Sequence, residues 1–515
     1  MDTPTVCFRS CTRTHLKDKG RDKRLMWNNQ RDYQVVAKSE NDRRPPVDDI
    51  TTQIAEYVSG FEVDSAAALD AAHLCLIDTL GCAFEGLDSP ECTKLLGPLV
   101  PGTIVPYGAR VPGTAFELDP IKAAFDIGSM ARWFDFTDTY LGAQASHPSD
   151  NIAGILALAD HLSRTRQAAK RKAFFVREML AAIVKAYEIQ GVLAMENSMF
   201  NAGLDHTLLI KVATAGVATQ MLGGGYEQIV SAVTNAWIDG HSLAIYRRSP
   251  HAGPRKSWSG GDAGARGLFL AMLAAHGEMG YPSALTAKTW GLYDVLFKAQ
   301  AFRIPRAYGC SVVQETQFKV LVPAVFNSQT AAECAIQLHP LVKDRICEIR
   351  SIKIFVHEMT LRMNTYRGHL STPAARDHCV QYIVAVGLLK GSIESSDYSS
   401  EAASDQRIGE LCGKTKVVED SSYTRDYADP GKRASANAVQ VFFIDGSSTP
   451  KVAIDYPIGH PQRRQEALPA LRRKFETNLA RVFSEKQRTR ILATCLDRRN
   501  VERLPVHEFV GFFVR

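Results

Sequence analysis

IRSIKIFV, from Ile349 to Val356, is the stretch of this sequence that decides the fold. Ile352 and Ile354 alternate with Lys353 and Phe355, and a period of two is typical of a half-buried strand. The three hundred residues before this stretch show the helical period instead. We therefore expect an α/β segment inserted into an otherwise helical chain.

Helical patterns flank this strand on both sides. Asp64 and Ser65 can cap a helix whose apolar residues recur from Leu69 to Leu80 and which ends at Gly81. Further helices are expected over Asn151 to Ser163, Phe174 to Glu196, Thr207 to Leu222, Glu227 to Gly240, Ala263 to Gly277, Ala374 to Leu389 and Gln465 to Phe483.

Two further runs are β-rich, Ala438 to Ile444 and Lys451 to Tyr456. The connection between them opens with Asp445-Gly446, a turn signal, so they predict a hairpin. The polar stretch from Ser392 to Arg433 predicts a loop with some helix.

The composition is that of an ordinary globular protein. The 515 residues are 45% hydrophobic and 23% charged, and the length suggests about two to four domains. The net charge is +6, but residues 1–45 hold 11 basic against 6 acidic residues and the other 470 hold 50 against 49. A nucleic-acid-binding protein needs a basic face on its folded body, so we expect no nucleic-acid partner.

No segment has the pattern of a membrane span or of a secretory signal. The best candidate for a span, Leu208 to Leu222, is interrupted by Lys211 and falls short of the roughly 18 residues required. The eleven cysteines are scattered, without CxxC or zinc spacing. We expect no membrane partner and an intracellular location, cytoplasmic or mitochondrial. The basic arm also carries aspartates, which mitochondrial presequences avoid, so it predicts a disordered leader.

Residues suited to acid–base chemistry gather first between Trp133 and Asn151. Asp135, Asp138 and His147 lie there, and His147 stands at the entrance of a predicted helix. The alternative is that His147 and Asp138 only cap and brace the turn. A second segment, Gly203 to His206, pairs an aspartate with a histidine, although such a pair is more often a helix cap with a surface imidazole.

Cationic residues are concentrated in two further segments. Arg247 and the run from Pro254 to Asp262, which contains Lys256 and a Gly-Gly pair, suit a carboxylate or phosphate ligand. A solvated basic loop would give the same pattern. Lys319 lies in an otherwise apolar run, where the alternative is a side chain that only extends out to solvent.

Together these segments could bind a small polyanion and move protons. Removing a proton next to a carboxylate builds negative charge on that carboxylate. Such a site needs cations and a base that works near neutral pH, and Lys256, Lys319, His147 and His206 fit that need.

Ordered motifs from about Ile54 to Arg481 carry a family resemblance. They are Ile77 to Cys82 (IDTLGC), Gly108 to Thr114 (GARVPGT), Asp135 to Asn151, Tyr187 to Gly191 (YEIQG), Gly203 to Ala213 (GLDHTLLIKVA), Arg255 to Gly267 (RKSWSGGDAGARG), Gly277 to Tyr293 (GEMGYPSALTAKTWGLY), Arg376 to Val386 (RDHCVQYIVAV) and Tyr456 to Arg464. In these motifs the sequence resembles the MmgE/PrpD family, and within it the hydro-lyases that act on 2-methylcitrate.

The resemblance implies a mainly α fold with two parts. A large all-helical domain is made from both ends of the chain, and a smaller α/β lid domain is inserted near the C-terminal third. We expect a basic leader over residues 1–46, the helical domain over 47–316 and 456–515, and the lid over 317–455. A homodimer is also implied.

The resemblance further implies a site between the two parts and assigns its residues. Those expected to take part in catalysis are His147, His206, Asp135 and Thr139, and those expected to bind the substrate are Lys256, Lys319 and Arg247. Lys319 would reach in from the edge of the lid, whose closure would exclude water. His147 is expected to be the principal acid or base, and the division of roles between the two histidines stays open.

The expected function is dehydration of a 2-alkylcitrate, 2-methylcitrate or one with a longer chain, to the alkyl-cis-aconitate. The substrate is thus a small tricarboxylate. Neither a metal nor another cofactor is expected, because an iron–sulfur dehydratase needs three closely organised cysteines and the sequence shows no such set. A decarboxylase of a cis-aconitate-type tricarboxylate and a non-catalytic tricarboxylate-binding homologue are the alternatives.

The sequence also departs from the family pattern near the expected site. The hydro-lyases typically read DFNDTW where this chain reads Asp135 to Tyr140 (DFTDTY), and Gln144 stands where an acidic residue is usual. Asn327 replaces a histidine, and the usual RHAPN becomes Arg247 to His251 (RRSPH). Because Asp135, His147 and Lys256 are retained, these exchanges indicate a changed substrate and favour an alkylcitrate with a longer chain.

Overall fold

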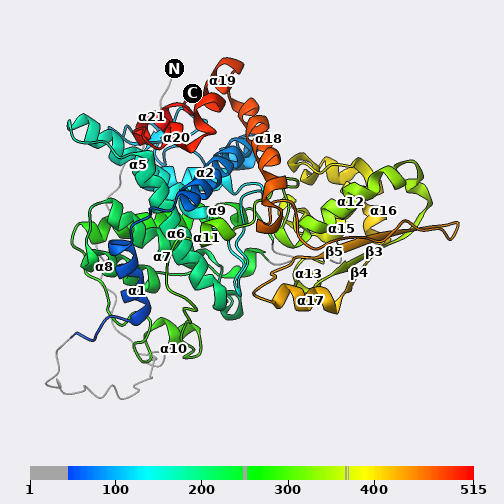
Figure 1. Cartoon of the computed structure of the whole chain (residues 1–515), viewed down its shortest axis with the longest axis horizontal. Helices are drawn as coiled ribbons and strands as arrows, with labels where there is room; N and C mark the ends of the chain where they lie inside the picture. The colour runs from blue at the N-terminus through cyan, green and yellow to red at the C-terminus, as the bar shows by residue number, and fades with distance from the viewer. Residues whose placement is uncertain (1–43, 248–251, 366–367, 369) are drawn as a thin grey trace, which may run out of the picture. The chain divides into compact units, whose positions relative to one another are not determined.

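Long helices built from both ends of the chain make up most of the molecule. The computed structural model describes residues 44–247, 252–365, 368 and 370–515, and Pro45–Arg515 forms one unit (Figure 1). The predicted leader therefore lies, up to residue 43, outside the described residues. The mainly α fold class is confirmed.

The helical part comes from the two ends of the described chain. Its first helices are α1 (Asp49–Gly60), α2 (Ala66–Gly86), α3 (Pro90–Thr93), α4 (Pro120–Ala131), α5 (Asp150–Ala168), α6 (Val176–Glu196), α7 (Thr207–Met221), α8 (Tyr226–Ile238), α9 (Arg255–Ala275), α10 (Leu292–Leu296) and α11 (Val312–Glu315). The C-terminal helices are α18 (Arg464–Val482), α19 (Glu485–Cys495), α20 (Arg498–Val501) and α21 (Val506–Gly511), and α18 packs against α2 (Figure 1). A short antiparallel pair joins β1 (Ala109–Arg110) to β2 (Glu117–Leu118).

The α/β part lies between them in sequence. Its helices are α12 (Gln329–Val342), α13 (Glu358–Met363), α14 (Pro373–Arg376), α15 (Val380–Lys390), α16 (Gln406–Gly413) and α17 (Ser421–Ala428). Its strands are β3 (Ile349–Val356), β4 (Thr415–Glu419), β5 (Asn437–Phe443) and β6 (Val452–Ile454), in the order β4-β3-β5-β6. α12 packs on β5 and β6, and α15 packs on α12 (Figure 1).

The sheet confirms the predicted strand and hairpin. Ile352, Ile354 and Val356 of β3 are fully buried, as the period of two requires. β5 and β6 pair antiparallel, and the turn between them contains Gly446 at φ 87°. The parallel edge strand β4 was missed, because its two adjacent valines stand among polar residues and give no alternation.

Apolar side chains gather in two separate clusters. One joins helices from both ends of the chain, and the other is confined to residues between Val322 and Ile454. This segregation agrees with a helical domain and a lid, although Pro45–Arg515 forms one unit. The domain limits therefore stay predictions.

α2 is the core helix of the helical part. Of the two predicted caps, Ser65 is the one that accepts the Ala68 N–H, and the helix continues through Gly81 to Gly86. Gly81 lies within the helix, and its lack of a side chain allows close packing, since a Cβ there would stand 3.2 Å from the Phe475 ring on α18. By length and composition alone α2 could cross a membrane, but 78% of its apolar window is buried inside the molecule.

Two of the wrongly predicted helix boundaries fall at the site. α9 begins at Arg255 and not at Ala263, so the Gly-Gly run that suggested a loop forms helical turns. The glycines are there for close packing, since a Cβ at Gly261 would stand 2.7 Å from the Phe125 carbonyl oxygen of α4. The helix expected over Ala374 to Leu389 is broken into α14 and α15 by three residues beginning with Asp377.

Candidate functional site

A cleft of about 1440 Å³ is lined by residues of both the helical part and the α/β part. Four of the predicted site residues line it: Asp135, His147, His206 and Arg247. His378, from the break between α14 and α15, lines the same cleft. These predicted residues therefore lie at a space that a small molecule could occupy.

His147 is held as a neutral imidazole in one tautomer. Its Nδ1 lies 2.6 Å from the carbonyl oxygen of Asp138, and a carbonyl oxygen can only accept. The ring proton is therefore on Nδ1, and Nε2 keeps its lone pair. Burial, with Arg132 and Lys319 nearby, holds the pKa of His147 well below its usual 6.5, so the ring is neutral at neutral pH. Thr139 Oγ1 stands 3.4 Å from Nδ1 and helps to fix the ring.

His206 stands between two carboxylates. Its Nδ1 lies 2.9 Å from Asp205 Oδ1, and its Nε2 lies 3.6 Å from Asp150 Oδ2. Each ring nitrogen therefore has a carboxylate oxygen nearby. Its ring centroid is 5.5 Å from that of His147, edge to face, so the two imidazoles can act on one substrate.

Arg247 holds the Asp205 carboxylate from the other side. Its guanidinium forms an ion pair with Asp205 and donates to Ser259 Oγ on α9 at 3.1 Å. Burial alone would raise the pKa of Asp205, but Arg247 and His206 bring it well below its usual range. Arg247 is thus engaged with a protein carboxylate, and the next four residues, Arg248–His251, lie outside the described ranges.

Asp135 is the centre of a buried ionic cluster. Lys319 Nζ lies 2.5 Å from its Oδ1 and 3.0 Å from its carbonyl oxygen, and Arg132 donates to the same Oδ1 at 2.9 Å. Against the effect of burial, these cations hold the pKa of Asp135 well below its usual range. Burial lowers the pKa of Lys319 to about 8, although Asp135 opposes that shift. Lys319 is wholly buried and does not line the cleft.

Lys256 forms the ionic contact between α9 and the α/β part. Its Nζ donates to both oxygens of Asp377, at 2.8 and 3.0 Å. Asp377 Oδ1 also lies 2.6 Å from His378 Nδ1, and His378 Nε2 lies 3.5 Å from Asp135 Oδ2. Lys256 is only 2% exposed, so this pair is buried. His378 therefore lines the cleft from the α/β part, and His147 and His206 line it from the helical part.

Lys474 on α18, one of the C-terminal helices, holds the backbone around this ionic cluster. Lys474 Nζ donates to Asp78 Oδ1 at 2.6 Å and to the carbonyl oxygens of Phe136 and Lys319 at 2.7 and 2.9 Å. The Lys474 ammonium thus holds the backbone next to Asp135, at Phe136, and the backbone of Lys319 itself. This contact explains how residues from the end of the chain position the site.

The inner cations, Arg132, Arg247, Lys256 and Lys319, are all paired with protein carboxylates. Their partners are Asp135, Asp150, Asp205 and Asp377, and the Arg132 Nε to Asp150 Oδ1 distance is 3.2 Å. Four positive charges therefore meet four negative ones. We expect Lys256, Lys319 and Arg247 to bind the substrate, but in the structure each of them is paired with a protein carboxylate. Their substrate-binding role stays a prediction.

Gln144 and Asn327, two of the residues that depart from the family pattern, differ in their position relative to the cleft. Gln144 is fully buried, donates to the Ala145 carbonyl and accepts from the Phe200 N–H, and it does not line the cleft. Asn327 does line it and donates to Asn364 Oδ1 at 2.9 Å, while its own Oδ1 is buried without a hydrogen-bond partner. The exchange at Asn327 therefore alters the cleft, and the one at Gln144 alters the packing of its wall.

Asp377, His378 and Arg132 are residues that sequence reasoning missed as site residues. Asp377 and His378 stand inside the helix that the sequence predicts over Ala374 to Leu389, whereas the structure has them between α14 and α15. A helix break marked by Asp-His-Cys was the available signal.

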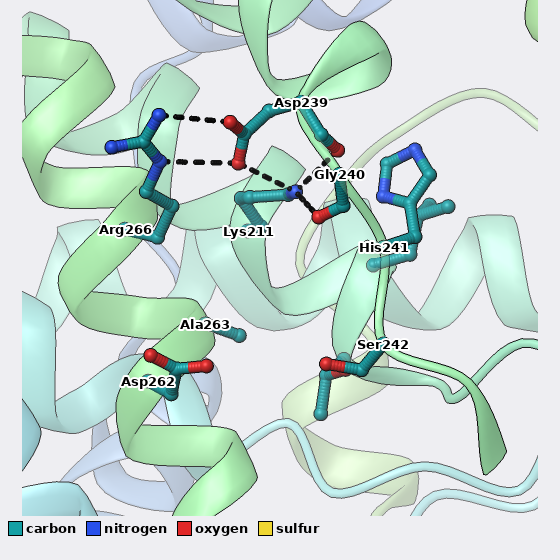
Figure 2. A pocket seen from close by; sticks show the side chains of 10 residues that line it. Lys211, Asp239, Gly240, His241, Ser242, Asp262, Ala263 and Arg266 are labelled. Carbon is teal, nitrogen blue, oxygen red and sulfur yellow. Dashed lines mark hydrogen bonds and ion pairs between the residues drawn. The ribbon is translucent and has the colours of Figure 1, made fainter.

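A smaller cavity of about 230 Å³ lies between α7 and α9 (Figure 2). Lys211 enters it from α7, but its Nζ donates to the Asp239 carboxylate and to the carbonyl oxygens of Asp239 and Gly240, all at 2.8–2.9 Å. Arg266 grips the same carboxylate in a forked pair. These side chains brace the loop after α8, and no predicted site residue lines this cavity.

Comparison with known families matches nearly the whole described chain. The MmgE/PrpD N-terminal domain matches residues 52–305, and the MmgE/PrpD C-terminal domain matches residues 322–498. The first match ends before the α/β part begins, and the second spans the sheet and continues into the C-terminal helices.

Individual relatives cover most of the chain at high identity. A 2-methylcitrate dehydratase of Cupriavidus necator is 52% identical over 92% of this chain and 98% of its own length. The mitochondrial 2-methylcitrate dehydratase of Yarrowia lipolytica is 44% identical over 92% of this chain and 91% of its own. The 2-methylcitrate dehydratase-like protein oryR of Aspergillus oryzae is 39% identical over 93% and 98%.

Proposed function

The chain belongs to the MmgE/PrpD family, and from this premise we propose that it is a hydro-lyase that dehydrates a 2-alkylcitrate, with 2-methylcitrate as the first candidate. The observation that carries the proposal is the pair of imidazoles, His147 and His206, whose ring centroids are 5.5 Å apart at the cleft. A backbone carbonyl holds the first ring, and the second stands between two carboxylates. A dehydratase needs one group that takes a proton and one that gives a proton.

His147 would be the base. Its Nε2 lone pair would take the proton from the carbon next to a substrate carboxylate, while the Asp138 carbonyl holds the ring in place. The low pKa of free His147 makes it a weak base, but a bound tricarboxylate brings negative charge that raises this pKa toward neutrality. The electron pair of the broken C–H bond would form the new double bond as the hydroxyl leaves.

His206 would be the acid. Asp205 holds its Nδ1–H, and its buried Nε2 has no hydrogen-bond partner among the described residues, so an Nε2–H could be given to the departing hydroxyl as water forms. Lys319, Arg132 and Lys256 surround Asp135 and would supply positive charge next to the enolate-like intermediate. In this proposal protein cations stabilise that charge and no metal takes part.

The proposed substrate is a small tricarboxylate with an alkyl group. The cleft of about 1440 Å³ exceeds the roughly 300–1,000 Å³ of an ordinary small-molecule site, so it must narrow around 2-methylcitrate or hold a longer chain. Phe297 and Phe302 from one wall and Phe326 and Met359 from the other would contact the alkyl group. We propose that residues 317–455 act as the lid that narrows the cleft, in an intracellular homodimer.

The test is to incubate the purified protein, with and without a chelator, with stereoisomers of 2-methylcitrate and of longer alkylcitrates and to follow product mass. Loss of water that survives the chelator supports the proposal, and the preferred chain length identifies the alkyl group. The same assay with cis-aconitate detects loss of carbon dioxide, which would identify a decarboxylase instead. Binding of every stereoisomer without turnover would indicate a binding protein.

A further inference from the structure

Four cations other than the inner cations line the same cleft. These outer cations are Lys298, Arg303, Arg362 and Arg433. None of their side chains forms an ion pair or a hydrogen bond with any residue in the described part of the chain. They differ in this respect from all four inner cations, each of which has a carboxylate partner.

The outer cations come from both walls of the cleft. Lys298 and Arg303 follow α10 in the helical part. Arg362 lies in α13, and Arg433 lies between α17 and β5 in the α/β part. A ligand that reached cations of both pairs would therefore connect the two parts of the protein.

The backbone at two of these positions is held in an uncommon conformation. Lys298 and Ala299 have φ of 53° and 61°, and Arg433 has φ of 46°. Left-handed backbone costs about 1 kcal/mol or more for a residue other than glycine and is concentrated at binding sites. Lys298 and Arg433 thus share this conformation on opposite walls, although they are far apart in sequence.

The balance of charge at the cleft makes the outer cations the groups available to pair with an anionic ligand. The inner set balances four cations with four carboxylates. Glu196 and Glu358 also line the cleft, so the outer cations exceed the outer carboxylates by two. A tricarboxylate brings about three negative charges, and burying them next to a neutral set would cost free energy unless unpaired cations took part.

We propose that the outer cations bind the carboxylates of the substrate, with both walls contributing, and so draw the walls together around it. This inference rests on the proposed function only in taking the substrate to be a polycarboxylate. An unpaired cationic rim also raises the rate of encounter with an anion, and this effect weakens with salt. The inner cations then keep their carboxylate partners and shape the field around the histidines.

The experiment compares binding of tricarballylate, a tricarboxylate without a hydroxyl group, to the full chain by calorimetry at several salt concentrations. One variant removes the cations of each wall: Lys298→Gln with Arg303→Gln, and Arg362→Gln with Arg433→Gln. The matched control is Arg473→Gln with Lys486→Gln, two exposed cations on α18 and α19 that are outside the cleft. Thermal melting checks that each variant folds.

Each wall variant should raise the Kd of tricarballylate at least about fivefold and flatten its salt dependence, and the control should bind like the wild type. A smaller rise in both wall variants would overturn the inference, and a smaller rise in only one would overturn the contact with both walls. Weakened tricarballylate binding in a protein that dehydrates no alkylcitrate would support this inference while the proposed function fails. If the protein dehydrates an alkylcitrate but both wall variants bind tricarballylate like the wild type, the proposed function stands and this inference fails.

Discussion

The Nδ1 atom of His147 lies 2.6 Å from the carbonyl oxygen of Asp138. Because that oxygen cannot donate, this one contact selects the tautomer that leaves Nε2 as a base. The backbone of Asp138 is fixed in turn through its side chain, which accepts from Tyr187 Oη at 2.8 Å and from the Ser149 N–H at 3.2 Å. Tyr187 of α6 and Ser149, the residue before α5, thus hold the Asp138 backbone that the His147 ring contacts.

Replacing His147 by Asn tests this role directly. The Asn amide can still donate to the Asp138 carbonyl, but it has no basic nitrogen. We expect kcat for dehydration to fall at least about a hundredfold, while the melting midpoint stays close to that of the wild type. Absorbance of the new carbon–carbon double bond gives the rate, and turnover near the wild-type value would remove His147 from the mechanism.

The activity should depend on pH through Lys319. Lys319 is charged below its pKa of about 8 and neutral above it, so its pairing with Asp135 is lost as the pH rises through that value. His147 stays unprotonated down to well below pH 6.5. We therefore expect kcat/KM, which reports the free enzyme, to be level from pH 6.5 to about 8 and to fall above that. A profile that stays level through pH 10 would contradict the assignment.

Gly260 should be needed for the charge around His206. A Cβ at this position would stand 2.7–2.8 Å from the Asp150 carboxylate, which pairs with Arg132 and faces His206. Gly260→Ala should displace that carboxylate and lower kcat at least about tenfold. Gly264→Ala on the same helix is the control, since its Cβ would come no closer than 3.4 Å to any atom. Equal activity in the two variants would refute this prediction.

The buried pair of Lys256 and Asp377 should matter most when only one partner is removed. Asp377→Leu leaves the Lys256 ammonium buried without a carboxylate, at a cost of about 3–5 kcal/mol. Adding Lys256→Met should restore much of the melting midpoint, because neither charge of this pair then stays buried without its partner. If the double variant melts below both single variants, the pair does not act as the structure indicates. Arg345→Gln at an exposed pair should leave the midpoint unchanged.

Sequence patterns predicted the features that depend on local periodicity. The Ser65 cap, the limits of α7 to within one residue and the strand β3 follow from capping and burial within a few residues. The motifs also identified the family, which the comparisons confirm. These features could be predicted because they depend on residues that are close together in the sequence.

Features that depend on distant contacts could not be predicted in this way. The start of α9 was wrong because Gly260 and Gly261 are required by packing against α5 and α4, and a glycine pair otherwise signals a turn. Lys256 meets Asp377 at a separation of 121 residues. The tautomer of His147 depends on a backbone carbonyl, which no side-chain pattern records. The predicted roles of the site residues stay predictions; these residues are His147, His206, Asp135, Thr139, Lys256, Lys319 and Arg247.

The most direct test of the central claim is the mass of the product formed from 2-methylcitrate by the wild-type protein and by His147→Asn. We expect the wild type to yield the unsaturated tricarboxylate, lighter by one water, and the variant to yield it at least about a hundredfold more slowly. Loss of carbon dioxide, unchanged 2-methylcitrate with the wild type, or equal rates for the two proteins would contradict the claim.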